Sequence, residues 1–286
     1  MQKGSEKDIA KRNNVSANHV NRILNQISED KIVKNYGKLP NAIGIDEFKA
    51  TKDTISKMAF IIVDQNNRNI FDINNSRLSI DINKYFKRYS KQERDKVKII
   101  TMDLYKPYYV IMHNLFKNAT LVPDRFHIVI QARNALDNTR IKLCTKSNPN
   151  YKKLKKYNKH FKKEVTEKEI VTYLINTNKQ LYNDYQIYQG IDNAINTRDK
   201  KLFFKIINNN INNKNISKKM KQALKTYKDM EKYINNSFDY EYSNGIVEGI
   251  NNVIKQIKHT ACGYKKFNHL KARVMLIKGL LNPIHE

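Results

Sequence analysis

Short apolar runs separated by polar turns organise the first part of the chain. Residues 42–48, 58–64 and 69–73 are rich in Ile, Val, Phe and Ala, and residues 64–68, which join the second and third runs, read Asp-Gln-Asn-Asn-Arg. Apolar runs of this length that are bounded by turn-forming residues are typical of strands. The pattern predicts three successive strands in an antiparallel meander.

Helical and strand-like patterns alternate after the meander. Residues 79–89 and 107–117 have helical patterns, and residues 97–102 and 120–122 are short apolar runs typical of strands. After residue 125 the pattern is helical almost to the end of the chain. Three hairpin strands followed by alternating helices and strands is the element order of a ribonuclease-H-like fold, so we predict an α/β protein with a mixed sheet.

The first 27 residues predict a small helix-turn-helix. The Asn pair at residues 13–14 tolerates the unusual backbone angles of a turn, and Ser16 is placed to cap the second helix. The residues expected to pack the two helices together are Ile9, Ala10, Val20, Ile23 and Leu24. The residues of the second helix expected to be available to DNA are His19, Asn21 and Arg22. An ordinary helical hairpin is the alternative interpretation.

The charge of the chain favours nucleic acid as a partner. The 286 residues include 54 Lys and Arg against 27 Asp and Glu, which gives a formal net charge of +27. Basic side chains that neutralise phosphates release condensed counterions, and this release drives salt-sensitive binding to DNA. A solvated, lysine-rich surface is the alternative interpretation of each lysine run taken singly.

Cysteine usage and hydropathy exclude several other classes. Cys144 and Cys262 are far apart and form no Cys-x-x-Cys pair, which argues against a disulfide framework and a zinc ribbon. No apolar run approaches the roughly 18 residues of a membrane span, and the N-terminus has no signal-peptide core. We expect a protein of the reducing cytoplasm with no membrane partner.

Three acidic residues are candidates for a metal site. Asp46 and Asp103 close apolar runs predicted to be buried strands, and Glu248 lies on the polar face of the amphipathic segment 244–259. Two like charges about 4 Å apart repel by about 4 kcal/mol at an effective dielectric of about 20, so converging carboxylates need a cation to stay ionised. An all-oxygen site suits Mg²⁺ or Mn²⁺. Taken singly, each residue has an ordinary alternative as a turn cap or a solvated helix residue.

Blocks of sequence around these acids resemble a known family. The blocks are Gly44-Ile-Asp-Glu-Phe48, Met102-Asp-Leu-Tyr-Lys-Pro-Tyr108, Asp124-Arg-Phe-His127 with Arg140 downstream, and Asn244-Gly-Ile-Val-Glu-Gly-Ile-Asn-Asn252 followed by Gly263-Tyr-Lys-Lys-Phe267. Together and in this order they resemble the ISL-three family of bacterial insertion-sequence transposases, over about residues 5–280. Tyr105 stands where we expect Trp after the second aspartate.

The resemblance implies a DDE catalytic domain of ribonuclease-H-like fold. Asp46, Asp103 and Glu248 take the family's catalytic, metal-binding positions, and two Mg²⁺ or Mn²⁺ ions are the implied cofactors. The resemblance also implies that the helical stretch between the second and third acids is an insertion in the catalytic fold. The expected organisation is a helix-turn-helix segment at residues 1–36, a first catalytic part at 41–143, an α-helical insertion at 144–240 and a C-terminal catalytic helix and tail at 241–286.

The Asp124-x-x-His127 motif is similar to one that lies close to the active site and the DNA in related transposase groups. His127 has three possible roles: a contact with the scissile phosphate, orientation of a neighbouring carboxylate, or a hydrogen bond at a helix start. Asp124 is equally a candidate N-cap. The DNA-contact candidates outside the helix-turn-helix are Arg125, His127, Arg133 and Lys255, with solvated positions as the alternative for the two arginines.

The leading hypothesis from the sequence is a transposase that binds the terminal inverted repeats of its element and target DNA, and that cleaves and transfers strands as a homodimer at the bacterial nucleoid. Family members usually carry a cysteine-rich zinc-binding segment before the helix-turn-helix, and this chain shows none. A truncated, non-catalytic DNA-binding derivative that acts as a repressor or inhibitor is therefore the alternative. A ribonuclease-H-like nuclease or resolvase with the same carboxylates is a third interpretation.

Overall fold

The computed structural model describes residues 4–27, 37–149, 151–152, 175–176 and 178–277. The chain divides into two compact units, the first made of Met1–Val122 and Tyr242–Glu286 and the second of Pro123–Glu241. Parts of the predicted helix-turn-helix segment (residues 1–3 and 28–36), of the predicted insertion (150, 153–174 and 177) and of the C-terminal tail (278–286) lie outside the described residues.

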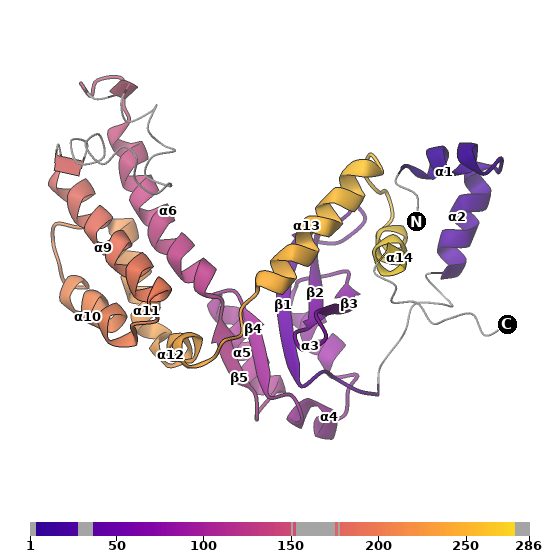
Figure 1. Cartoon of the computed structure of the whole chain (residues 1–286), viewed down its shortest axis with the longest axis horizontal. Coiled ribbons are helices and arrows are strands. Elements are labelled where there is room, and N and C mark those ends of the chain that lie inside the picture. Colours follow the sequence, from indigo (N-terminus) through magenta and orange to yellow (C-terminus); the bar gives the residue numbers. More distant parts are fainter. Residues whose placement is uncertain (1–3, 28–36, 150, 153–174, 177, 278–286) are drawn as a thin grey trace. The chain divides into compact units, whose positions relative to one another are not determined.

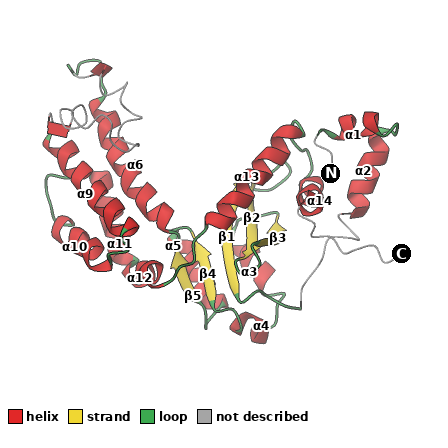
Figure 2. Cartoon of the chain, in the orientation of Figure 1, coloured by secondary structure: helices red, strands yellow, loops and turns green. Residues whose placement is uncertain are grey.

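Five strands form one mixed sheet in the first unit, in the order β3-β2-β1-β4-β5 (Figures 1 and 2). The strands are β1 (Ala42–Lys49), β2 (Met58–Asp64), β3 (Asn69–Asn74), β4 (Ile99–Met102) and β5 (Thr120–Pro123). β1, β2 and β3 pair antiparallel, and β4 pairs parallel to β1. The predicted meander and the predicted ribonuclease-H-like α/β class are confirmed.

β5 runs parallel to β4. The Thr120 amide at the start of β5 donates a 2.8 Å hydrogen bond to the carbonyl of Lys98, the residue that precedes β4. Both strands therefore begin at the same edge of the sheet, as expected for strands joined through a helix. Asp103 is the residue that follows the carboxyl end of β4.

Helices cover both faces of this sheet. On one face lie α3 (Ser79–Phe86) and α5 (Lys106–Leu115), with the five-residue α4 (Lys91–Asp95) before β4. α13 (Gly245–Thr260) packs on β1 and β2 from the other face and contacts α14 (Phe267–Ile277) (Figure 1). The predicted helix at residues 244–259 is confirmed, whereas the sequence pattern did not predict α4.

β2 supplies the core on both faces of the sheet. Its residues 59–63 are 0% exposed. Ile61 and Val63 belong to the same apolar cluster as Val247 and Ile250 of α13. The ring of Phe60 points the other way and contacts the rings of helices α3 and α5. Full burial stabilises each large apolar side chain by about 1.5–3 kcal/mol, which explains why this strand reads as a continuous apolar run.

The two N-terminal helices are α1 (Glu6–Arg12) and α2 (Ala17–Gln26). The expected turn chemistry is confirmed, because Asn14 has a φ of 52° and the Ser16 side chain accepts a 3.1 Å hydrogen bond from the His19 amide. The expected packing of Ile23 is wrong, since it is 41% exposed. α2 instead packs through Val20, Leu24 and Ile27, a stripe that turns Ile23 outward.

α14 completes the packing of these N-terminal helices. It contacts α2, and its Leu270 and Val274 belong to the same core cluster as Val20 and Leu24. The ring of His269 is 3% exposed; its Nδ1 lies 3.0 Å from Glu6 Oε1 and its Nε2 lies 2.8 Å from Asn25 Oδ1, so it joins three helices. Segments from the two ends of the chain thus share one core.

The second unit is helical. Its helices are α6 (Arg125–Leu143), α9 (Lys179–Asn196), α10 (Lys200–Asn210), α11 (Lys218–Asp229) and α12 (Glu231–Asp239). α6 packs on α9 and α11, and the buried Asp184 of α9 accepts hydrogen bonds from the Thr139 hydroxyl (2.6 Å) and the Ser217 amide (3.0 Å). Burial raises the pKa of Asp184. α6 begins at Arg125, and the bounds of the α-helical insertion, residues 144–240, stay a prediction.

No helix in the described parts of the chain has the length and apolar character needed to cross a lipid bilayer.

Substitution by Ala should change the stability of the protein in opposite directions at two glycines, one on β1 and one on α13. A Cβ at Gly44 of β1 would lie 2.7 Å from Val247 Cγ2 and 2.5 Å from Gln65 Nε2, whereas a Cβ at Gly249 of α13 would meet nothing within 4 Å. We expect Gly44→Ala to lower the free energy of unfolding by about 1–3 kcal/mol. Gly249→Ala should raise it by about 0.5–1 kcal/mol because it removes a helix glycine. Urea unfolding of both variants measures this, and equal shifts would contradict the close approach at Gly44.

Candidate active site

Asp46 and Asp103 lie on neighbouring parallel strands. The register of β1 and β4 pairs Ala42 with Ile99 and Gly44 with Thr101. The same offset, continued for two residues, places Asp46 level with Asp103. Because neighbouring strands are about 4.8 Å apart, the two aspartates belong to one edge region of the sheet.

The two aspartates differ in their relation to the strand end. Asp103 directly follows the last residue of β4, as predicted. Asp46 was expected to close its strand, but β1 continues to Lys49. The reason is that β1 stays paired with β2 as far as Lys49 and Met58, whereas its pairing with the shorter β4 stops at Gly44. Asp46 therefore lies where β1 extends beyond β4.

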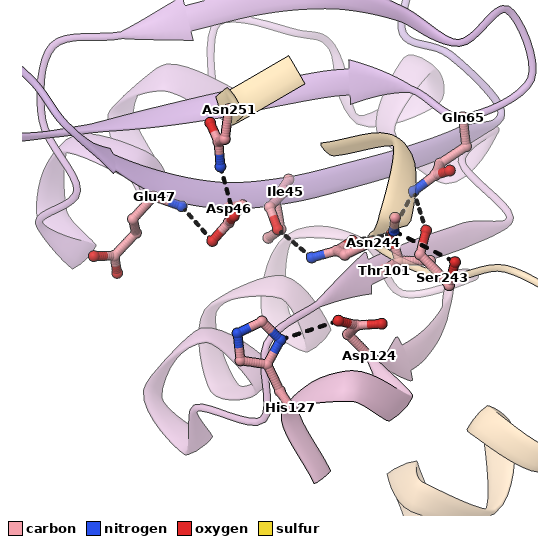
Figure 3. A network of polar contacts seen from close by, with 11 residues as sticks. Ile45, Asp46, Glu47, Gln65, Thr101, Asp124, His127, Ser243, Asn244 and Asn251 are labelled. Atoms are coloured by element: carbon pink, nitrogen blue, oxygen red, sulfur yellow. Dashed lines mark hydrogen bonds and ion pairs between the residues drawn. The ribbon is translucent and has the colours of Figure 1, made fainter. Parts of the chain in front are cut away.

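The carboxylate of Asp46 accepts two hydrogen bonds from its surroundings (Figure 3). The backbone amide of Glu47 donates to Oδ1 at 2.7 Å, and the side-chain amide of Asn251, on α13, donates to Oδ2 at 2.7 Å. The second contact shows that this side chain faces α13. Donors on both oxygens limit rotation of the carboxylate.

Glu248 lies on α13 between two residues that contact β1. Asn244, Glu248 and Asn251 are spaced i, i+4, i+7 and so form one stripe on the helix. Asn251 contacts Asp46, and Asn244 donates through Nδ2 to the Ile45 carbonyl at 3.0 Å. Glu248 is exposed and lies between these two anchor points. α13 thus carries the third acid to the part of β1 that holds the first.

The three acids do not form one tight ligand cluster. Within the described structure, the ligand atoms of Asp46, Asp103 and Glu248 do not all lie within 4.8 Å of one another. All three nevertheless offer carboxylate oxygens, the ligand type that Mg²⁺ and Mn²⁺ prefer. The donor set therefore fits a hard divalent cation, or two cations that share the acids between them.

A buried polar network fixes the start of α13 on the sheet (Figure 3). Gln65 Nε2 donates to Thr101 Oγ1 (2.7 Å) and to the Ser243 carbonyl (3.0 Å), and Thr101 Oγ1 donates to Asn244 Oδ1 (2.6 Å). Thr101 is 0% exposed, Asn244 3% and Gln65 5%. Since buried polar groups are costly unless paired, this network specifies where α13 docks.

Sequence reasoning missed this network. Asn244 lies on the polar stripe of α13, yet it is buried against Ile45 and Thr101. Amphipathic spacing cannot distinguish a polar residue in water from one that binds a strand. The available signal was the position of Asn244 in the same sequence block as Glu248.

Glu47, the acid next to Asp46, is bound on the opposite side of the sheet. Side chains alternate along a strand, and its carboxylate contacts Arg77 Nη1 (2.5 Å) and the hydroxyl of Tyr108 on α5. Burial, followed by the hydrogen bond to Glu47, raises the pKa of Tyr108. Glu47 therefore has a structural role that leaves Asp46 as the acid on the α13 side.

His127 and Asp124 form a local pair in the second unit. Asp124 precedes α6, and its Oδ2 lies 3.0 Å from His127 Nδ1 instead of capping a backbone amide (Figure 3). Of the roles considered for His127, the structure shows a contact with a neighbouring carboxylate at the helix start. A phosphate contact of His127 stays a prediction.

The DNA-contact candidates of the second unit include residues that already contact other parts of the same unit. Arg125 Nη1 donates to the carbonyls of Ser237 (3.0 Å) and Tyr240 (3.3 Å), and burial lowers the pKa of Arg125. It therefore caps the end of α12, which makes a structural role sufficient to explain it. Arg133 is half-buried on α6.

In the first unit, Arg22 and Lys255 are exposed. Asn21 is partly buried, and its Nδ2 donates to Glu6 Oε2 at 3.4 Å, so it links α2 to α1. The half-buried His19 contacts Arg22 through Nδ1 at 3.1 Å. Arg22 and Lys255 are therefore the candidates with the best access to a DNA backbone.

The chain matches the family DDE_Tnp_ISL3, described as Transposase, over residues 43–274. This range includes β1 with Asp46, the end of β4 with Asp103, and α13 with Glu248. The chain belongs to this transposase family. This membership supports a transposase function. It also implies that the protein binds DNA and uses a divalent metal.

A protein of Lactococcus lactis subsp. lactis named "ATP-dependent protease" is 33% identical to the chain over 123 residues. The shared segment covers 42% of this chain and 39% of that protein. The chain thus spans well under half the length of this relative, and the name describes that protein alone.

Proposed function

We propose that this transposase cleaves the DNA at the ends of an insertion sequence and joins the cut strands to target DNA, with Asp46, Asp103 and Glu248 as its metal ligands. One observation carries the proposal: α13 is bound to β1 on both sides of Glu248. Asn244 donates to the Ile45 carbonyl and Asn251 donates to Asp46, and Glu248 lies between them on the same helix, which supports its assignment as the third acid.

The orientation of the two aspartates supports a shared ligand. Thr101 and Gly44 both face α13, since Thr101 bonds Asn244 and a Cβ at Gly44 would meet Val247. Side chains two residues apart share a face, so Asp46 and, by continuation of β4, Asp103 are directed the same way. Two ionised carboxylates on neighbouring strands repel each other, and a cation bound between them offsets this repulsion.

The chemistry follows from this set of oxygen ligands. Bound divalent ions would activate a water or a DNA 3′-hydroxyl and stabilise the leaving oxygen in an in-line phosphoryl displacement. The chain contributes position: Asp46 is held by two hydrogen bonds, and the buried network at Thr101 holds the helix that carries Glu248. Ligands fixed in this way lose little freedom when the metal binds.

DNA binding in this proposal is dominated by charge. The net charge of +27 gives a strong attraction to phosphate, and Arg22 and Lys255 are exposed on two different helices of the first unit. The ends of the element and the target are the proposed DNA partners. Concerted cleavage at two ends requires at least two active sites, so we propose a homodimer on DNA, associated with the nucleoid.

Cleavage of labelled duplexes tests this proposal. The purified full chain is incubated with a duplex carrying the element end or a scrambled end, in Mg²⁺, in Mn²⁺ and in EDTA. We expect nicking at the element end that requires Mg²⁺ or Mn²⁺. Binding without cleavage in either metal would instead support a non-catalytic DNA-binding protein. Equal cleavage of the scrambled duplex would support a ribonuclease-H-like nuclease.

A further inference from the structure

Asn251 is a buried polar residue that contacts a proposed metal ligand. It lies in the middle of α13, is 5% exposed and donates from Nδ2 to Asp46 Oδ2 at 2.7 Å (Figure 3). Its neighbour Asn252 is exposed. Asparagine is a moderate helix former, and burying its amide is costly without partners, so a helix needs a reason to place it here.

The direction of the Asn251 amide follows from its partner. An ionised carboxylate only accepts hydrogen bonds, so the NH₂ group and not the oxygen must face Asp46. Among the described residues, Asn251 Oδ1 is buried and accepts no hydrogen bond. A purely structural asparagine at this depth would use both ends of its amide, as Asn244 does with Ile45 and Thr101.

Asn244 and Asn251 therefore have different roles. Asn244 binds a backbone carbonyl and a threonine hydroxyl, which fixes the helix to the sheet. Asn251 binds the acid itself, which fixes the rotation of the carboxylate together with the Glu47 amide. Each oxygen of Asp46 accepts one of these two bonds.

We propose that Asn251 is a positioning residue that holds the Asp46 carboxylate in the orientation required to bind the divalent metal. This inference rests on the proposed function of Asp46. Loss of a group that orients a metal ligand typically weakens metal binding by roughly 10–100-fold. Asn251→Ala should therefore weaken metal binding far more than it destabilises the fold.

Direct Mn²⁺ binding tests the role of Asn251. Free and bound Mn²⁺ are measured by electron paramagnetic resonance in the full chain, for the wild type, Asn251→Ala, Asn251→Gln, Asp46→Asn and the control Asn252→Ala. We expect a dissociation constant raised about tenfold or more in Asn251→Ala, a smaller rise in Asn251→Gln, which keeps the amide, and no change in Asn252→Ala. Thermal unfolding without metal shows which variants are folded.

The outcomes separate this inference from the proposed function. Loss of Mn²⁺ binding in Asp46→Asn with wild-type binding in folded Asn251→Ala would overturn the role of Asn251 alone. If Asn251→Ala does not fold, Asn251→Gln decides instead: wild-type Mn²⁺ binding in this variant would overturn the role of Asn251, and weaker binding would support it. The unfolding temperature of Asn251→Gln shows whether that variant is folded. Unchanged binding in Asp46→Asn would overturn the proposed function itself.

Discussion

Asp46→Asn is expected to lower the rate of metal-dependent cleavage of element-end DNA by roughly 10³-fold or more, with DNA affinity nearly unchanged. The amide keeps the shape of the side chain on β1 but removes the charge that binds the cation. DNA affinity should persist because it depends on the basic surface, which carries the net charge of +27. Single-turnover cleavage and a binding titration, both in Mg²⁺, measure the two quantities.

Glu47 provides the matched control for Asp46. It is the next residue on the same strand, it faces the other side of the sheet and its carboxylate contacts Arg77 and Tyr108. Glu47→Gln should cleave DNA within several-fold of the wild-type rate and lower the unfolding temperature. Cleavage by Asp46→Asn at the wild-type rate, or equal loss in both variants, would show that the two acids do not have the roles assigned to them.

Asn244→Ala is expected to lower the free energy of unfolding of the first unit by about 2–4 kcal/mol. The substitution removes the acceptor of the buried Thr101 hydroxyl and the donor to the Ile45 carbonyl, and leaves a cavity between α13 and β1. Buried polar groups that lose their partners cost about 1–3 kcal/mol each. Urea unfolding followed by circular dichroism measures the change.

Asn252→Ala is the control for that substitution, since Asn252 is exposed on the same helix. Its effect on stability should stay within about 0.5 kcal/mol. Asn244→Ala should also reduce cleavage, because α13 carries Glu248 and would dock less firmly. A stability change in Asn244→Ala as small as that of Asn252→Ala would contradict the docking role of the buried network.

Much of the sheet could be predicted because its inner strands are largely buried on both faces. The run at β2 is continuously apolar for this reason, and the turn at residues 64–68 separates it clearly from β3. α4 could not be predicted in the same way. It has five residues and none of them is buried, so no apolar periodicity marks it.

The acids were visible in the sequence, but the contacts that hold them were not. Asp46 and Asp103 stand beside apolar runs, and Glu248 stands in an amphipathic segment. Asn251 and Asp46 are 205 positions apart, and Thr101 and Asn244 are 143 apart. Pairing over such separations depends on how α13 docks, which local patterns do not contain.

A crystal structure of the protein soaked with Mn²⁺ tests the shared metal site most directly, because anomalous scattering locates the ion without reference to activity. We predict an anomalous peak bound by Asp46 and Asp103, with Glu248 as a further ligand, and no such peak in Asp46→Asn. A Mn²⁺ peak on other residues, in crystals of protein that cleaves DNA with Mn²⁺, would contradict the assignment of these three carboxylates.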